Sequence, residues 1–200
     1  MESLRQFFND MASIWDEKVF HPSEKVRFIL ELMEISKGFK ILDVGCGTGV
    51  LIPYLIEKTG SSGEIIGIDI AEKMLEIARA KFPEDSFPNV KFVHADFMDF
   101  EYQGKFDTII FYSVFPHIQH KQKCIKKAAS LLAAGGKLTI CHSESREKIN
   151  SIHRMTGFPV SHDLLPSAQE VANFMKQAGL EILHSIDNDD LYVVIGSLSN

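Results

Sequence analysis

The sequence predicts one α/β domain whose sheet is doubly wound and mostly parallel. Three observations predict this fold. Short apolar runs alternate with amphipathic stretches, a glycine-rich loop follows the first run, and a polar turn at 187–190 separates the last two runs. Strands that alternate with helices favour a parallel sheet covered on both faces, and a polar turn between apolar runs is typical of an antiparallel hairpin. We therefore expect seven strands, with one reversed strand at the edge of the sheet.

Each strand and helix follows from hydrophobic periodicity. The expected strands are Lys40–Val44, Glu64–Asp69, Val90–His94, Phe106–Tyr112 and Lys137–His142, followed by the hairpin strands Glu181–Ile186 and Leu191–Ile195. The expected helices cover residues 24–35, 48–58, 71–82, 118–133, 144–155 and 168–178. Ser167 and Glu170 form a capping box before the last helix, and Gly179 ends it.

Length, charge and cysteine content narrow the class of protein. A chain of 200 residues fits one domain, which we expect to span residues 1–200. Lys and Arg number 21 against 27 Asp and Glu, so the net charge of −6 gives no basic face for a nucleic acid. No apolar run reaches the length of a membrane span. Cys46, Cys124 and Cys141 form no disulfide framework and indicate a reducing compartment, so we predict a cytoplasmic protein.

The strongest functional signal is the loop after the first strand. Asp43 is followed by Gly45, Gly47 and Gly49 where the strand turns into a helix. Glycines let a ligand approach the backbone closely, and the first turn of a helix offers unpaired N–H groups. A dinucleotide-binding loop has its third glycine one residue later, at the position of Val50, so the spacing disfavours a nicotinamide-dependent oxidoreductase.

Acidic residues end the second strand and follow the third. Asp69 ends the second strand, where a carboxylate can accept both hydroxyls of a ribose. Asp96 and Phe97 follow the third strand, and a hydrogen-bond acceptor beside an aromatic ring suits an adenine. Together with the glycine loop, these positions resemble the cofactor site of the class I S-adenosylmethionine-dependent methyltransferases.

The resemblance implies a Rossmann-like methyltransferase fold with S-adenosyl-L-methionine as cofactor and S-adenosyl-L-homocysteine as product. It implies that Asp43 holds the methionine amino group, directly or through water, and that Asp69 binds the ribose. Gly45, Cys46 and Gly47 are expected under the methionine moiety. The set is completed by Ile70 and Met74, expected beside the adenine, and by Asp96, Phe97, Tyr112 and Trp15. The cofactor-binding core is therefore expected at residues 37–142.

The start of the chain favours a small-molecule acceptor. Residues 8–16 are similar to the opening segment of small-molecule methyltransferases, including those of ubiquinone and menaquinone synthesis. In these relatives an N-terminal helix lies over the cofactor, so the resemblance implies a lid at residues 1–36, with Trp15 and Phe20 as apolar covers. Residues 113–117 replace the Asn/Asp-Pro-Pro-Tyr/Phe run of enzymes that methylate amino groups of nucleic acids. A nucleic-acid partner is therefore not expected.

Polar residues after the fourth and fifth strands are the catalytic candidates. His117 follows the fourth strand and His142 ends the fifth, and ligands of parallel sheets bind beyond these strand ends. Arg146, Asn150 and His153 share one face of the next helix, beside a separate apolar stripe. We expect His117 or His142 to remove a proton from the acceptor, and Arg146 to orient the acceptor through its planar guanidinium.

We expect a monomer or homodimer that transfers a methyl group to an organic small molecule. Two alternatives to this function stay open. The histidines, with Cys141 near them in sequence, could ligate a soft metal or metalloid acceptor. Strand alternation directs Cys141 away from His142, however, and we expect no resident metal ion. The second alternative is a methyltransferase-fold subunit that binds ligands without turnover. In each case residues 143–200 are expected to form acceptor-side helices and the terminal hairpin.

Overall fold

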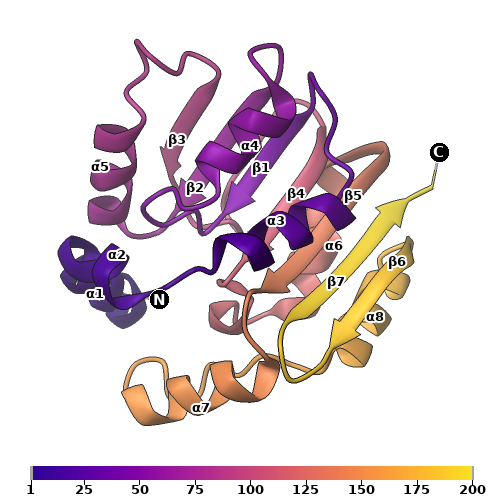
Figure 1. Cartoon of the computed structure of the whole chain (residues 1–200). Coiled ribbons are helices and arrows are strands. Elements are labelled where there is room, and N and C mark those ends of the chain that lie inside the picture. The colour runs from indigo at the N-terminus through magenta and orange to yellow at the C-terminus, as the bar shows by residue number, and fades with distance from the viewer. Residues whose placement is uncertain (1, 200) are drawn as a thin grey trace.

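The computed structural model describes residues 2–199, in which seven strands form one sheet (Figure 1). The strands are β1 (Lys40–Val44), β2 (Glu64–Asp69), β3 (Val90–His94), β4 (Phe106–Tyr112), β5 (Leu132–His142), β6 (Leu180–Asp187) and β7 (Tyr192–Leu198). Their order across the sheet is β3-β2-β1-β4-β5-β7-β6. Neighbouring strands from β3 to β5 pair in parallel, and β7 is antiparallel to both β5 and β6. This is the doubly wound sheet that the sequence predicts.

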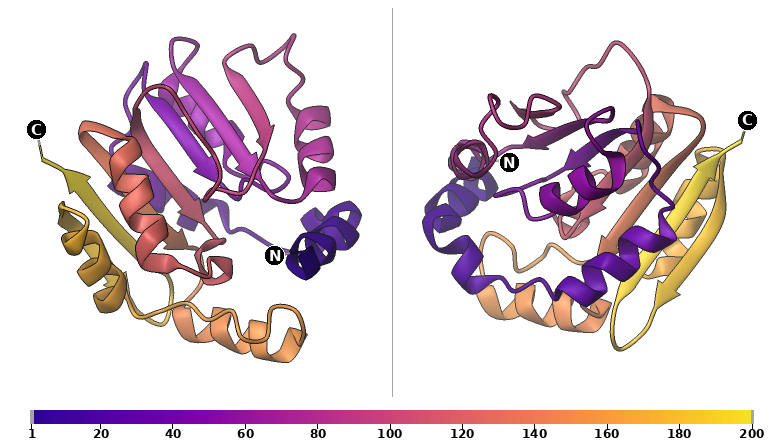
Figure 2. Two further views of the ribbon diagram at one scale, coloured as in Figure 1. Left: turned by 180° about the vertical axis from the view of Figure 1, so that it is seen from behind. Right: turned by 45° about the horizontal axis from the view of Figure 1, so that its top comes forward.

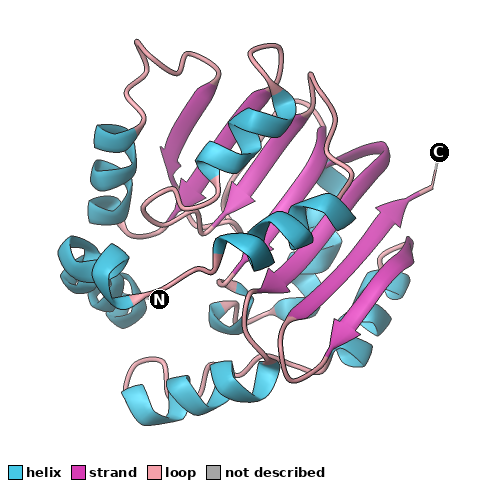
Figure 3. Cartoon of the chain, viewed as in Figure 1, coloured by secondary structure: helices cyan, strands magenta, loops and turns pink. Residues whose placement is uncertain are grey.

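Helices cover both faces of the sheet (Figure 2). The covering helices are α3 (Ser23–Leu32), α4 (Ile52–Thr59), α5 (Glu72–Lys81), α6 (Lys121–Leu131) and α8 (Ala168–Gln177). One core cluster joins α3 and α4 to the sheet through side chains such as Ile29 and Leu55. A second cluster joins α6 and α8 to it through side chains such as Ile125 and Val171. The sheet therefore lies between two layers of helices, which are cyan beside the magenta strands in Figure 3.

The expected element bounds hold for β1 to β4 and differ at the fifth strand. β5 begins at Leu132, which pairs with Phe106, and a register shift follows before Lys137 pairs with Thr108. Gly135 has φ +71°, a left-handed conformation that glycine adopts without steric cost. The segment between the expected helix at 118–133 and the expected strand at Lys137 is therefore an irregularity inside β5, because the chain pairs with β4 on both sides of it.

The expectation that the reversed strand lies at the edge of the sheet is wrong. β7, the reversed strand, lies between β5 and β6, and β6 forms the edge. The burial of the two strands explains the order. Residues Tyr192 to Ile195 of β7 are all buried, whereas β6 alternates buried or half-buried side chains with exposed ones. A strand without alternation needs cover on both faces, so the more apolar strand of the hairpin takes the inner place.

The carboxyl ends of the parallel strands meet at one edge of the sheet, where the remaining helices gather (Figure 1). The N-terminal helices α1 (Glu2–Met11) and α2 (Trp15–Lys18) lie beside this edge near β2. Helix α7 (Arg146–Thr156) follows β5 on the same side, and a short 3-10 turn at Phe115–His117 follows β4. Ligands of parallel α/β sheets bind at this edge, so the fold brings the predicted site residues to one place.

Candidate active site

The glycine loop between β1 and α4 has a backbone that only glycine fits at Gly45. Its φ is +69°, and a Cβ there would lie 2.3 Å from Cγ2 of Val114. The backbone N–H groups of Gly45 and Cys46 both donate to the carbonyl of Ile68. Cys46 is buried against Gly67, where a Cβ would lie 2.9 Å from its sulfur, and burial raises the pKa of the Cys46 thiol. The Cys46 thiol therefore stays neutral. The small size of the side chain, and not its reactivity, suits the loop.

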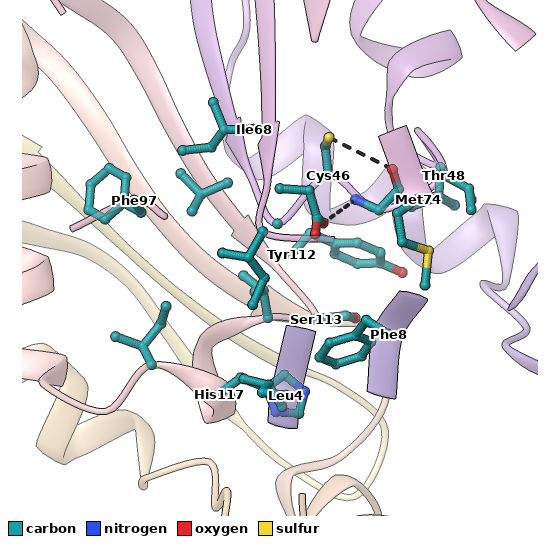
Figure 4. A pocket seen from close by; sticks show the side chains of 18 of the residues that line it. Leu4, Phe8, Cys46, Thr48, Ile68, Met74, Phe97, Tyr112, Ser113 and His117 are labelled. Carbon is teal, nitrogen blue, oxygen red and sulfur yellow. Dashed lines mark hydrogen bonds between the residues drawn. The ribbon is translucent and has the colours of Figure 1, made fainter. Parts of the chain in front are cut away.

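A cavity lies above this loop, with about 870 Å³ of empty space when the solvent at its mouth is included. Figure 4 shows Cys46 and Thr48 of the loop on one side of the cavity, and Phe8 and His117 on another. Of the residues expected to bind the cofactor, only Asp43 does not line this cavity. The residues that do line it are Gly45, Cys46, Gly47, Asp69, Ile70, Met74, Asp96, Phe97, Tyr112 and Trp15. The sequence therefore identified the wall of one continuous cavity.

Asp69 is held by the loop it faces. Its Oδ2 accepts the N–H of Gly47 at 2.9 Å, and its Oδ1 accepts the N–H of Ala71 at 2.8 Å. Burial raises the pKa of Asp69, and these backbone donors act in the opposite direction by stabilising the carboxylate. Each oxygen keeps a further lone pair for a ligand. Asp69 thus fixes the loop and also presents an acceptor to the cavity.

Asp43 lies directly behind the cavity wall, which contains its neighbours Val44 and Gly45. The Asp43 side chain is 1% exposed, and its Oδ2 has no hydrogen-bond partner in the described residues. Burial, and secondarily the charge of Asp69, raise the pKa of Asp43 to about 7. A buried carboxylate without a partner is costly, so a cationic or donor group of a ligand would stabilise it.

Asp96 and Phe97 form the far end of the cavity. The Oδ1 of Asp96 accepts the N–H of Met98 at 2.8 Å, which fixes the carboxyl group after β3. Phe97 is buried and packs edge-to-face on Phe111 at 5.1 Å between ring centroids. Asp96 therefore has a second oxygen free for a ligand, whereas Phe97 contributes mainly to the core beside it.

The N-terminal segment closes one side of the cavity. Leu4, Phe8 and Trp15 contribute to the wall, and Phe8 packs edge-to-face on Trp15 at 5.6 Å between centroids. Asp16 links this segment to the core, because it accepts hydrogen bonds from Thr48 of the glycine loop and from Lys81 of α5. Burial alone would raise the pKa of Asp16, but the hydrogen bond from Lys81 lowers it.

A second cavity adjoins the first, with about 1390 Å³ of empty space when the solvent at its mouth is included. The two share five lining residues, which are Phe8, Trp15, His21, Ser113 and His117. The outer part of the second cavity is largely apolar, with Val19 and Phe20 from the N-terminal segment and Ile152 from α7. Phe20 is 80% exposed, so it covers the rim of this second cavity rather than the cofactor side expected from the sequence.

Two histidines of the second cavity are bound to Asp163. The Nδ1 of His117 donates to the Asp163 carboxylate at 2.8 Å, and the Nδ1 of His153 donates to the Asp163 carbonyl. The two imidazole rings lie 4.9 Å apart between centroids. When Nδ1 donates, the neutral ring carries its lone pair on Nε2. His117 lies where the two cavities meet, so it combines an oriented ring with access to both.

The other candidates on and before α7 have different surroundings. His142 lines the second cavity but is 1% exposed, and neither ring nitrogen has a partner in the described residues. Arg146 lines neither cavity, because its Nε donates to Asp187 at 2.8 Å at the start of the hairpin turn. The structure thus places Arg146 away from the acceptor position expected for it. Asn150 is buried and binds the backbone of Leu165 on both its donor and acceptor sides, so it is structural.

Sequence reasoning missed a hydrogen-bonded chain between the cavities. His21 Nδ1 donates to the hydroxyl of Tyr112 at 2.8 Å, and that hydroxyl donates to Ser143 at 2.9 Å. His21 lines both cavities, and burial lowers its pKa. Asp163 was missed as well. Both His21 and Asp163 lie in connecting segments without periodicity, so the sequence carries no local signal for either.

Comparison with known proteins decides the family. A family model described as a methyltransferase domain matches residues 35–192. The chain belongs to this methyltransferase domain family. It is a class I S-adenosylmethionine-dependent methyltransferase.

Relatives of this methyltransferase include quinone-modifying enzymes by name. The demethylmenaquinone methyltransferase of Staphylococcus aureus (strain MRSA252) is 28% identical over 177 residues, covering 85% of this chain and 70% of the relative. That of Lactococcus lactis subsp. lactis (strain IL1403) is 33% identical over 114 residues, covering 54% of this chain and 45% of the relative. The similarity therefore extends over most of the chain in one relative and over about half in the other.

Solved structures share the fold of this methyltransferase. A SAM dependent methyltransferase from Aquifex aeolicus has a TM-score of 0.71 at 20% identity, covering 90% of this chain and 100% of that one. N-methyltransferase NodS from Bradyrhizobium japonicum WM9, in complex with S-adenosyl-l-homocysteine, has a TM-score of 0.67 at 15% identity. The match covers 89% of this chain and 87% of that one. These neighbours confirm the Rossmann-like methyltransferase fold.

Two further observations concern membranes and metals. Within residues 2–199, no helix is both long and apolar enough to cross a membrane. The same residues contain no group of three or more His, Cys, Asp or Glu side chains placed to hold a metal ion. Cys141 packs in the cluster of α3 and α4, whereas His142 contacts Tyr192 of the other cluster, so the two side chains lie on opposite faces of the sheet, as strand alternation predicts. The cytoplasmic location and the monomeric or homodimeric state stay predictions.

Proposed function

We propose that this methyltransferase binds its acceptor in the second cavity, and that His117, oriented by Asp163, removes the acceptor's proton during methyl transfer. One observation carries the proposal. His117 lies in the walls of both cavities, so a single ring is adjacent to the expected methyl donor and to the expected acceptor. A base at that junction can act on the attacking atom while the methyl group is in line with it.

The first cavity is proposed as the S-adenosylmethionine site. The unpartnered Oδ2 of Asp43 suits the methionine ammonium, approached through the loop or through water, and Asp69 has free lone pairs for ribose hydroxyls. Gly45 and Gly47 have φ values of +69° and +54°, a left-handed conformation that glycine adopts without steric cost, and both line the cavity. Bound there, the cofactor supplies an electrophilic methyl group on a sulfonium. The residues present therefore fit this cofactor.

His117 suits the role of base better than the other histidines. Asp163 accepts its Nδ1–H and so fixes the ring; in the neutral ring the lone pair is then on Nε2, and the carboxylate stabilises the imidazolium that forms when Nε2 takes a proton. His142 is a poor base, because burial lowers its pKa to about 3. His153 donates to a backbone carbonyl rather than to a carboxylate, and burial lowers its pKa.

The proposed acceptor is an apolar organic molecule with an ionisable oxygen, nitrogen or sulfur atom. The outer wall of the second cavity is apolar, and the relatives named above act by name on demethylmenaquinone. A turnover screen tests the function directly. The protein is incubated with S-adenosylmethionine and single phenols, quinols, thiols and amines, and release of S-adenosylhomocysteine is measured. Tight cofactor binding without turnover of any acceptor would support a non-catalytic subunit instead.

We also propose that the N-terminal segment acts as a lid held by Asp16. We expect Asp16→Asn to speed the release of S-adenosylhomocysteine about two- to fivefold, because a half-exposed ion pair stabilises a closed state by about 0.2–1 kcal/mol. Trp15 is the chain's single tryptophan and lines both cavities, so its fluorescence in stopped-flow mixing reports the lid.

A matched control separates the lid from general charge loss. Arg27 and Glu57 form an exposed ion pair between α3 and α4, away from both cavities. Arg27→Gln should leave the release rate unchanged. High salt should speed release from the wild type but not from Asp16→Asn, because salt screens half-exposed pairs. Equal release rates in Asp16→Asn and the wild type at low salt would contradict the lid.

A further inference from the structure

The histidines of the second cavity differ sharply in their partners. His117, His153 and His21 each donate a ring N–H to a protein group. His142 has no partner on either nitrogen within the described residues, although it is 1% exposed. A buried neutral imidazole leaves one donor and one acceptor unsatisfied, and such groups are rare in folded proteins because they cost stability.

The surroundings of His142 leave the cavity as the side from which a partner can approach. The ring packs edge-to-face on Tyr192 of β7, at 6.1 Å between centroids, and the hydroxyl of Tyr192 also lacks a partner. Its chain neighbour Ser143 accepts the hydroxyl of Tyr112 and makes no hydrogen bond to the ring. His142 forms part of the wall of the second cavity together with Ser113 and His117.

We infer that His142 binds a second polar group of the acceptor, a neutral ether, carbonyl or hydroxyl oxygen, while the first polar group is methylated beside His117. This inference rests on the proposed function and names the substrate class more closely. The acceptor then has two oxygen-bearing positions, of which the one at His142 carries no charge.

The charges around the ring favour a neutral group there. Burial lowers the pKa of His142, with smaller contributions from His117 and His153, so the ring is uncharged near neutral pH and offers an N–H donor without a positive charge. Lys148 and Glu144 of the same cavity neutralise each other at 2.8 Å. An anionic group at His142 would therefore lose its hydration and meet an uncharged ring.

Binding of small phenols to the protein saturated with S-adenosylhomocysteine tests the inference by calorimetry. The probes are phenol, its 2-, 3- and 4-methoxy derivatives, and the ethylphenols of matching size. An ethyl group fills the same space but accepts no hydrogen bond. At one ring position, we expect the wild type to bind the methoxyphenol about tenfold more tightly than the ethylphenol, since the methoxy oxygen satisfies His142.

Three variants make the test specific. His142→Leu should remove the preference for the methoxyphenol and raise the unfolding midpoint of the ligand-free protein, because it deletes unsatisfied polar atoms. His142→Gln keeps a donor and an acceptor and should retain part of the preference. Tyr192→Phe, a control on the neighbouring ring that does not line the cavity, should keep the full preference.

The outcomes separate this inference from the proposed function. A wild type without the preference at any ring position, or a preference that persists in His142→Leu, overturns the role of His142. The protein can also show a preference that depends on His142 and yet methylate none of these phenols. That result supports the binding role of His142 and counts only against the proposed methyl-transfer chemistry.

Discussion

His117→Ala should lower the turnover number about 10²–10⁴-fold, the usual contribution of a general base, while affinity for S-adenosylmethionine stays nearly unchanged. The expectation follows from the position of the ring at the junction of the two cavities and from its hydrogen bond to Asp163. Steady-state kinetics with an acceptor found in the turnover screen measures the loss, and calorimetry measures cofactor affinity.

An acceptor that needs no base provides the internal control. A phenol that is already ionised at the assay pH, such as a nitrophenol, should lose far less turnover in His117→Ala than an un-ionised phenol. Added imidazole should restore part of the activity by entering the space left by the ring. An equal loss for ionised and un-ionised acceptors would show that His117 positions the substrate and removes no proton.

Asp163 acts through His117 and is tested as a positioning residue. Asp163→Asn should lower the turnover number with little change in the KM of either substrate, because it removes the charge that stabilises the imidazolium but keeps an acceptor for Nδ1–H. In the His117→Ala background the same substitution should have no further effect on turnover. Additive losses in the double variant would contradict the pairing.

Asp43→Asn should weaken binding of S-adenosylhomocysteine about 10–100-fold, the range for losing a hydrogen bond to a charged group. The reason is the unpartnered carboxylate oxygen of Asp43 behind the glycine loop, which suits the ammonium of the methionine moiety. Since burial raises the pKa of Asp43 to about 7, wild-type affinity should fall as the pH is lowered through 7. The variant should lack this pH dependence. Calorimetry from pH 6 to pH 7.5 measures both effects.

Cofactor affinity should rise with pH, whereas the stability of the ligand-free protein should fall as the pH rises. The ordinary pKa of an aspartate is about 3.9, so between that value and about 7 the folded chain keeps a proton that the unfolded chain releases. Asp43 therefore destabilises the folded protein increasingly as the pH rises through this window. Asp43→Asn should raise the unfolding midpoint at pH 8 and leave it nearly unchanged at pH 4.

A second aspartate of the sheet serves as the control for Asp43. Asp107 accepts the backbone N–H of Lys40 at 2.7 Å and lines neither cavity. Asp107→Asn should therefore leave cofactor affinity and its pH dependence as in the wild type. Unchanged affinity in Asp43→Asn would mean that the ammonium binds elsewhere, and the proposed placement of the methionine moiety would have to be abandoned.

Much of the fold could be predicted from local patterns. β1 to β4 are short apolar runs bounded by polar residues, and their bounds agree with the structure. Ser167 caps α8 by accepting the N–H of Glu170, as the capping box predicts. The place of the reversed strand was missed, although the unbroken apolar run from Tyr192 to Ile195 carried the signal. Strand order depends on which hairpin strand needs two covered faces, and that is a property of the assembled sheet.

The two halves of the candidate site differ in how far the sequence alone determined them. The cofactor half was determined locally, because the glycine loop, Asp69 and Asp96 each follow a strand end that the parallel sheet brings to one edge. The acceptor half was decided by tertiary packing. Asp163 reaches His117 across 46 residues and His21 reaches Tyr112 across 91, while Arg146 turns to Asp187 and His142 is left without a partner. Periodicity places a side chain on a face of its own element, but its partner depends on which distant segment packs there.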